Sequence, residues 1–188
     1  MSSQGKLSYV LTLIAVLSLG ACCNKPADPS GFETDLLHQI NAVEKQIMAL
    51  EQAMPQEKFT WRPASGVRSV SEVYMHIAFS NYGLLNIMGF DPPADVKLTG
   101  DIRSDVARWD SSNVDKAAIV GILKTSMDHL KATLPKVTDL EKKIDFFGQQ
   151  VTMRNMLLTI LAHLHEHFGQ SIAYARMNGV VPPWSAGG

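Results

Sequence analysis

The stretch TMRNMLLTILAHLHEHFGQSIAYARM, residues 152–177, decides the fold expected of this chain. Its inward positions recur every three or four residues, which is the period of one helix face. These positions are Met156, Ile160, His163, His167, Ser171 and Tyr174. Asn178-Gly179 is a helix stop, and Pro182-Pro183 follow it. A long amphipathic helix of this kind buries its face against other helices.

Three further segments carry the same period. Residues 32–54 place an apolar stripe on one face and end at Pro55: Leu36, Ile40, Val43, Ile47, Leu50 and Met54. A second helix is expected from a cap at Ser69 or Ser71 to about Met88, with Val73, Ile77, Ser80, Leu84 and Ile87 buried. A third spans about 114–134. Four such helices and no strong strand pattern predict an all-α, antiparallel four-helix bundle.

Two connections stand out. Residues 89–113, between helices two and three, form a long loop, and loops of this length are usually functional or partly helical. Trp109 is expected to pin this loop to the bundle. Residues 142–151 alternate weakly and predict either a short hairpin or an extended arm.

Composition bounds the function. The chain has 188 residues, 46% hydrophobic and 19% charged, which is enough for one globular domain with a single core. The net charge is -1, and there is no basic stripe, so a nucleic-acid partner is not expected.

The N-terminus predicts an export signal. Lys6 precedes an apolar run from Leu7 to Leu19, too short to span a bilayer as a helix. Leu19-Gly20-Ala21-Cys22 resembles a bacterial lipobox, which makes residues 1–21 a lipoprotein signal peptide and Cys22 the lipidated residue. The alternatives are ordinary signal-peptidase cleavage or a core helix.

Residues 22–31 are polar and rich in turn formers, as in a flexible tether, and residues 32–188 form the folded domain. Two or three acyl chains on Cys22 make a stable membrane anchor. The expected location is therefore the cell envelope, outside the cytoplasmic membrane.

Histidines carry the chemical signal. His163 and His167 are four residues apart and share a helix face, whereas His165 points elsewhere. Such a pair is half of a metal site, and its alternative is two hydrogen-bonded or surface histidines. A third ligand has to come from a facing helix. His76, at the inward edge of the second helix, is favoured over His129, which is flanked by charged residues.

Three landmarks, in order, resemble the DinB/YfiT-like family of metal-dependent bundle proteins. The first is WRP at residues 61–63 followed by SVSEVYMHIA at 69–78. The second is HLHEHFGQ at residues 163–170, and the third is YARMNG at 174–179 before Pro182-Pro183. Phe168 departs from the arginine that the family usually has there, which weakens inferences about anionic or thiol substrates.

The resemblance implies that His76, His163 and His167 bind one divalent metal ion, with Zn, Ni and Fe all compatible with imidazole ligands. Asn81, Gln170 and Tyr174 are candidates for orienting the ligands or lining a pocket. The implied activities on a small-molecule substrate are hydrolysis, with water activated by the metal, and thiol transfer. A metal-binding or structural lipoprotein without turnover is the third alternative, and a homodimer is plausible.

Overall fold

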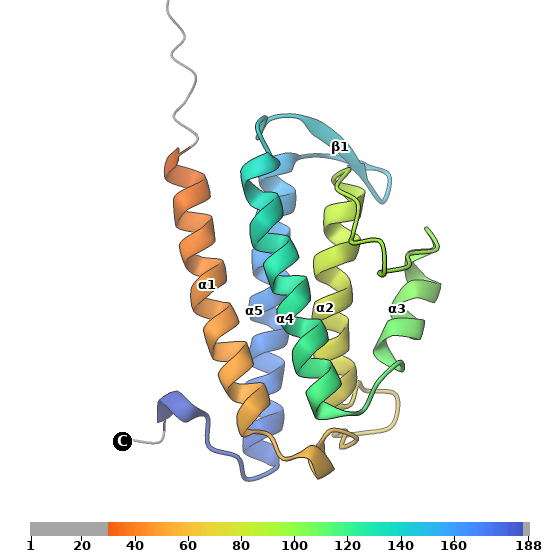
Figure 1. Cartoon of the computed structure of the whole chain (residues 1–188), viewed down its shortest axis with the longest axis vertical. Helices are drawn as coiled ribbons and strands as arrows, with labels where there is room; N and C mark the ends of the chain where they lie inside the picture. The colour runs from red at the N-terminus through yellow and green to blue at the C-terminus, as the bar shows by residue number, and fades with distance from the viewer. Residues whose placement is uncertain (1–29, 186–188) are drawn as a thin grey trace, which may run out of the picture.

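Four long helices form the body of the protein in this computed structural model, which describes residues 30–185 (Figure 1). They are α1 (Ser30–Ala53), α2 (Val70–Ile87), α4 (Lys116–Thr133) and α5 (Met153–Met177). The short helix α3 (Ile102–Asp110) packs against the outside of α2. Three single 3-10 turns, Gln56–Lys58, Leu134–Lys136 and Pro183–Ser185, complete the helical elements. The predicted all-α bundle is confirmed.

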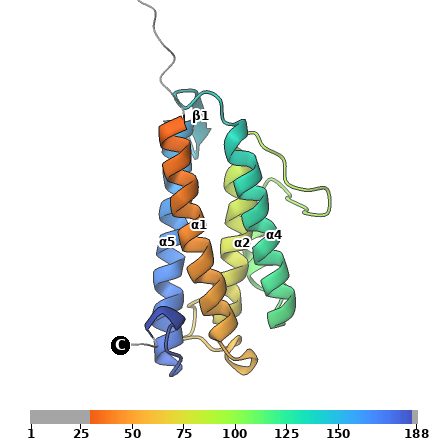
Figure 2. The same cartoon turned by 60° about the vertical axis from the view of Figure 1, so that its left-hand side comes forward.

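Not all neighbouring helices are antiparallel, which differs from the expectation. In Figures 1 and 2, α2 and α4 run in one direction, and α1 and α5 run in the other. The connection that contains α3 returns the chain to the end of the bundle where α2 begins, so α4 repeats the direction of α2. The antiparallel neighbours are α1 with α4 and α2 with α5, and the second of these pairs faces α2 toward the histidines of α5.

The stripe predicted for α1 is buried throughout, with Ile40, Ile47 and Leu50 fully inaccessible. The corresponding stripe on α4 is buried at Ile119, Leu123, Met127 and Leu130. Both helices lie at the outside of the bundle and bury one face, which is the situation in which the helical period identifies the core.

Helix α2 is buried on nearly every side, because α3, α4 and α5 all pack against it. Its predicted stripe therefore describes only part of the burial. Leu85 is fully buried, whereas Leu84 and Ile87 are half-buried. Of the two expected caps, Ser69 is the one observed. Its hydroxyl accepts from the Glu72 backbone N–H, while the Glu72 carboxylate accepts from the Ser69 N–H.

The long connection is partly helical, so the expected loop is corrected to a loop that contains α3. Asp101 caps α3 by accepting from the Arg103 N–H. The Trp109 ring packs against Phe79 and Tyr82 of α2, with centroid distances of 6.1 and 5.9 Å. The predicted anchoring of this segment by Trp109 is confirmed.

The weakly alternating segment is a hairpin rather than an extended arm. Strand β1 (Lys143–Phe146) pairs antiparallel with β2 (Gln149–Thr152), and Phe147 and Gly148 form the turn. The hairpin leads directly into α5, whose first turn is capped by the Thr152 hydroxyl.

The N-terminal predictions mostly lie outside the described residues, including the signal peptide and Cys22. Helix α1 begins at Ser30, so the last two residues assigned to the tether belong to the helix. Among residues 30–185, no helix has the length and apolar character needed to span a membrane.

Candidate metal centre

Three histidine side chains converge between α2 and α5. The Nε2 atom of His163 lies 3.2 Å from Nε2 of His76 and 3.1 Å from Nε2 of His167. His163 and His167 are neighbours because they are one turn apart on α5. His76 meets them from the facing, antiparallel α2. His167 is 6% exposed and the His76 side chain 12%, so the cluster is largely removed from water.

The donor set suits a divalent ion. Two nitrogens that each lie about 2.0–2.1 Å from a tetrahedral metal are about 3.3 Å apart. The two Nε2–Nε2 distances given above, 3.2 and 3.1 Å, are close to this value. One ring nitrogen from each of the three histidines can be chosen so that all three lie within 4.8 Å of one another. Among residues 30–185, this is the one group of three or more potential ligand side chains that meets this criterion. The cluster can therefore hold a metal ion, and imidazole donors alone do not select which one.

The protonation of the cluster favours metal binding. Burial, followed by the neighbouring His167, His76 and Arg68, lowers the pKa of His163 to about 3. Burial also lowers the pKa of His167. Both rings are neutral near pH 7, and a neutral ring offers the lone pair that a metal requires.

A chain of hydrogen bonds fixes the tautomer of His167. The Tyr174 hydroxyl donates to the Arg68 carbonyl at 3.0 Å, so it accepts from the Gln170 amide nitrogen at 2.9 Å. The amide oxygen of Gln170 then faces His167 Nδ1 at 2.8 Å and accepts its proton. A neutral ring protonated at Nδ1 leaves the Nε2 lone pair free. The Arg68 carbonyl thus determines which nitrogen of His167 is available to a metal.

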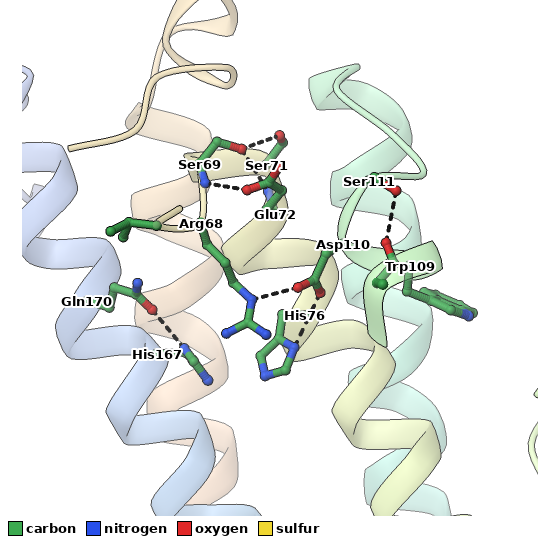
Figure 3. Close-up of polar contacts among 12 residues, drawn as sticks. Arg68, Ser69, Ser71, Glu72, His76, Trp109, Asp110, Ser111, His167 and Gln170 are labelled. Atoms are coloured by element: carbon green, nitrogen blue, oxygen red, sulfur yellow. Dashed lines mark hydrogen bonds and ion pairs between the residues drawn. The ribbon is translucent and has the colours of Figure 1, made fainter. Parts of the chain in front are cut away.

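Asp110, at the end of α3, provides the corresponding contact for His76. Its Oδ1 lies 3.3 Å from His76 Nδ1, and its Oδ2 accepts from Arg68 Nε at 2.6 Å (Figure 3). This contact does not have hydrogen-bond geometry, because within residues 30–185 both Asp110 Oδ1 and His76 Nδ1 are buried without a hydrogen-bond partner. A carboxylate behind a histidine favours the proton on the outer nitrogen and raises the basicity of the inner one.

Arg68 therefore links the two sides of the site through its carbonyl and its guanidinium. Its backbone is held in place because the Ser69 capping box begins α2 at the next residue. Glu72 of that box also accepts from Arg62 at 2.7 Å, and the Trp61 ring packs edge-on against Tyr174 at 5.3 Å. The segment of the first family landmark thus positions Arg68 against α5.

Sequence reasoning missed Arg68 and Asp110. Neither has a spacing that relates it to a histidine, because each acts from a loop or a helix end. One available signal was that a histidine ligand needs an acceptor for its outer nitrogen, and Asp110 follows the predicted anchor Trp109.

The predicted orienting residues divide into two groups. Gln170 and Tyr174 belong to the hydrogen-bond chain behind His167. Asn81 does not reach the cluster: its amide donates to the Ser126 hydroxyl at 3.1 Å, in the interface between α2 and α4. The expectation for Asn81 is therefore corrected. Helix α2 is buried on nearly every side, so a polar residue on it can face α4 instead of the histidines.

The remaining singled-out residues lie away from the cluster. His129 packs against Tyr82, with ring centroids 5.4 Å apart, and is not part of the group of three. His165 is exposed and contacts the Leu161 carbonyl through Nδ1. Phe168 is buried against Trp184, with centroids 5.4 Å apart. Phe168, which stands where the family usually has arginine, therefore packs against Trp184 near the C-terminus.

A cavity of about 360 Å³ adjoins the cluster, and His76 and His163 form part of its lining. The other lining residues come mainly from α2, α3 and the hairpin turn. A small molecule has access to two of the three histidines from this side.

Fold and site together define a class: helical bundles with a buried three-histidine cluster, two ligands from one helix and one from the facing helix. The family profile described as the DinB superfamily matches residues 39–171, and the chain belongs to this superfamily. No curated protein matches the sequence.

Two solved structures have the same fold. A DinB-like protein from Bacillus cereus is 19% identical, with a TM-score of 0.64, covering 82% of this chain and 95% of that protein. A DinB-like protein from Bacillus subtilis is 20% identical, with a TM-score of 0.60, covering 78% and 94%. The predicted family is confirmed.

Proposed function

We propose that this protein is a metal-dependent hydrolase in which His76, His163 and His167 bind one divalent ion of Zn, Ni or Fe. The observation that carries the proposal is the convergence of three imidazole nitrogens beside a cavity. An ion held by three imidazoles keeps positions open, lowers the pKa of bound water and polarises a carbonyl.

The chain's own residues prepare this chemistry. Gln170 accepts the outer proton of His167, and Asp110 lies behind the outer nitrogen of His76, so both inner nitrogens keep their lone pairs. Arg68 balances the charge of Asp110 beside the site. Phe79 and Val106 in the cavity wall provide an apolar surface beside the histidines.

The proposed setting favours hydrolysis over thiol transfer. We infer that Cys22 carries a lipid that anchors the protein outside the cytoplasmic membrane, where the usual cytosolic thiol cofactors are scarce. A homodimer remains a prediction from the sequence. Signal processing can be checked by mass spectrometry of the mature N-terminus and fractionation of the envelope.

The activity test compares the wild type with His167→Ala on a panel of p-nitrophenyl esters and anilides. We expect hydrolysis that a chelator abolishes, that added Zn, Ni or Fe restores and that the variant lacks. Low-molecular-weight thiols should not be required. Turnover that appears only when a thiol is present would instead support the transferase alternative, and metal binding without turnover on any substrate would support the non-catalytic one.

A further inference from the structure

A mainly apolar groove, whose lining also includes Ser80, Asn86, Arg103 and Asp105, adjoins the histidines. Its inner part is the 360 Å³ cavity next to His76 and His163, whose walls include Leu84 and Val106. A second hollow of about 160 Å³ continues along α2 toward Ile87 and Leu98. The two share four lining residues, Phe79, Gly83, Ile102 and Phe147, so they are neighbouring hollows along α2, and we call them together the groove. Each part is far larger than the roughly 10–15 Å³ that a cavity needs to hold one water molecule.

Gly83 keeps the floor of this groove open. A methyl group at this position would lie 3.3 Å from the Phe79 ring, closer than an ordinary contact. Glycine in a helix interior is less stable than alanine, and this position lies within α2. Alanine would favour the helix here, but its methyl group would crowd the Phe79 ring that lines the groove.

The hairpin turn contributes an aromatic wall at an unfavourable position. Phe147 has φ 54° and Gly148 has φ 84°, the left-handed pair of a two-residue hairpin turn. Such turns prefer Asn-Gly or Asp-Gly, because asparagine and aspartate tolerate positive φ. The chain nevertheless has an aromatic residue, Phe147, at this position. Phe147 is 67% exposed and lines both parts of the groove.

When an exposed residue occupies a backbone position that favours other residue types, a functional reason for its presence is indicated. In Figure 1 the hairpin lies across the end of the bundle at which α2 ends. Phe147, in the turn of this hairpin, lines both hollows. Phe147 is therefore in position to cover a ligand that lies along α2. An exposed aromatic ring gains most from such contact when the ligand is apolar.

We propose that the substrate is an amphipathic small molecule with an elongated acyl or aryl portion. This portion lies in the Phe79–Phe147 groove, while the scissile carbonyl group lies at the histidines. The inference rests on the proposed function and names its substrate class. Phe147 is a specificity-determining residue, because it lines both hollows in which the apolar portion lies.

The test uses the zinc-loaded protein and straight-chain alkyl hydroxamates, from acetohydroxamate to octanohydroxamate, which bind metals through a common head group. Calorimetry measures each affinity. We expect the affinity to rise about three- to fourfold per methylene while the chain occupies the groove. Equal affinity for the short and long members would overturn the groove assignment and leave the metal-based proposal intact.

The decisive variant is Phe147→Asn, because it creates the favoured Asn-Gly turn and removes the aromatic wall. We expect its thermal stability to equal or exceed that of the wild type, while the gain per methylene falls. Val114→Asn is the matched control at a position that is 53% exposed and lies outside the groove, and it should keep the full gain. An unchanged chain-length dependence in Phe147→Asn would overturn the role of Phe147.

A second readout does not depend on the metal. The fluorescent apolar probe 1-anilinonaphthalene-8-sulfonate should bind the metal-free protein and bind Phe147→Asn less tightly. If zinc and acetohydroxamate fail to bind but the probe shows this difference, the hydrolase proposal fails and the groove stands. If the probe binds both proteins equally, the groove assignment fails.

Discussion

Asp110→Asn tests how the site selects the tautomer of His76. In the wild type, one carboxylate oxygen accepts from Arg68 and the other faces His76 Nδ1 at 3.3 Å. Asparagine has nearly the same shape but only one acceptor oxygen, and Arg68 can only donate. The amide oxygen therefore stays with Arg68, and the amide nitrogen turns toward His76. His76 then accepts at Nδ1 and carries its proton on Nε2, where a metal would bind.

Substitutions that remove the partner behind a histidine ligand typically reduce metal affinity about 10- to 100-fold, which is about 1.4–2.7 kcal/mol. We expect a loss of this size for Asp110→Asn in a zinc competition titration against a chromophoric chelator at pH 7.5. Asp101→Asn is the matched control, since it makes the same change at the other end of α3 and keeps a capping side chain. An affinity for Asp110→Asn within twofold of the wild type would refute the tautomer argument.

Two further predictions concern residues outside the histidine triad. Tyr174→Phe removes the hydroxyl between Gln170 and the Arg68 carbonyl, and we expect the same titration to show a smaller, several-fold loss of zinc affinity; an unchanged affinity would show that Gln170 needs no such support. Burial raises the pKa of Glu51, whose carboxylate oxygens lack hydrogen-bond partners, to about 7, with Lys116 partly opposing the shift. The folded state holds this proton more tightly than the unfolded state. The contribution of Glu51 to the free energy of unfolding therefore declines as the pH rises from about 4.5 to 7, and it stays lost above pH 7. Glu51→Gln should therefore raise the free energy of unfolding by roughly 1–3 kcal/mol at pH 8 in urea titrations, and identical stability of the two proteins at pH 8 would contradict the assignment.

The helical period identified most of the core because α1, α4 and α5 each bury mainly one face. It was less informative for α2, where Tyr74, Tyr82 and Leu85 are buried on sides that the predicted stripe did not include. A partly helical connection was left open for residues 89–113, but the bounds of α3 were not predicted, because a helix of nine residues has too few turns to establish a period. Trp109 was predicted as the anchor of this segment, but its partners on α2, Phe79 and Tyr82, are contacts across space that no local pattern encodes.

The candidate site divides in the same way. Spacing alone placed His163 and His167 together and excluded His165, because those relations lie within one helix. The assignment of His76 as the third ligand needed information about which helix faces α5, and the family resemblance supplied it. Asp110 acts across space from a separate helix, and its role follows only from where α3 ends. The orientation of the site is therefore a property of the tertiary structure, while its ligands are largely a property of one helix.

Metal analysis of the purified protein tests the central claim most directly. We predict one divalent ion per chain in the wild type by inductively coupled plasma mass spectrometry after dialysis. His167→Ala should lose this ion, and His165→Ala, which changes an exposed histidine on the same helix, should keep it. A wild-type protein without stoichiometric divalent metal, or a His167→Ala variant that retains the full amount, would contradict the three-histidine site.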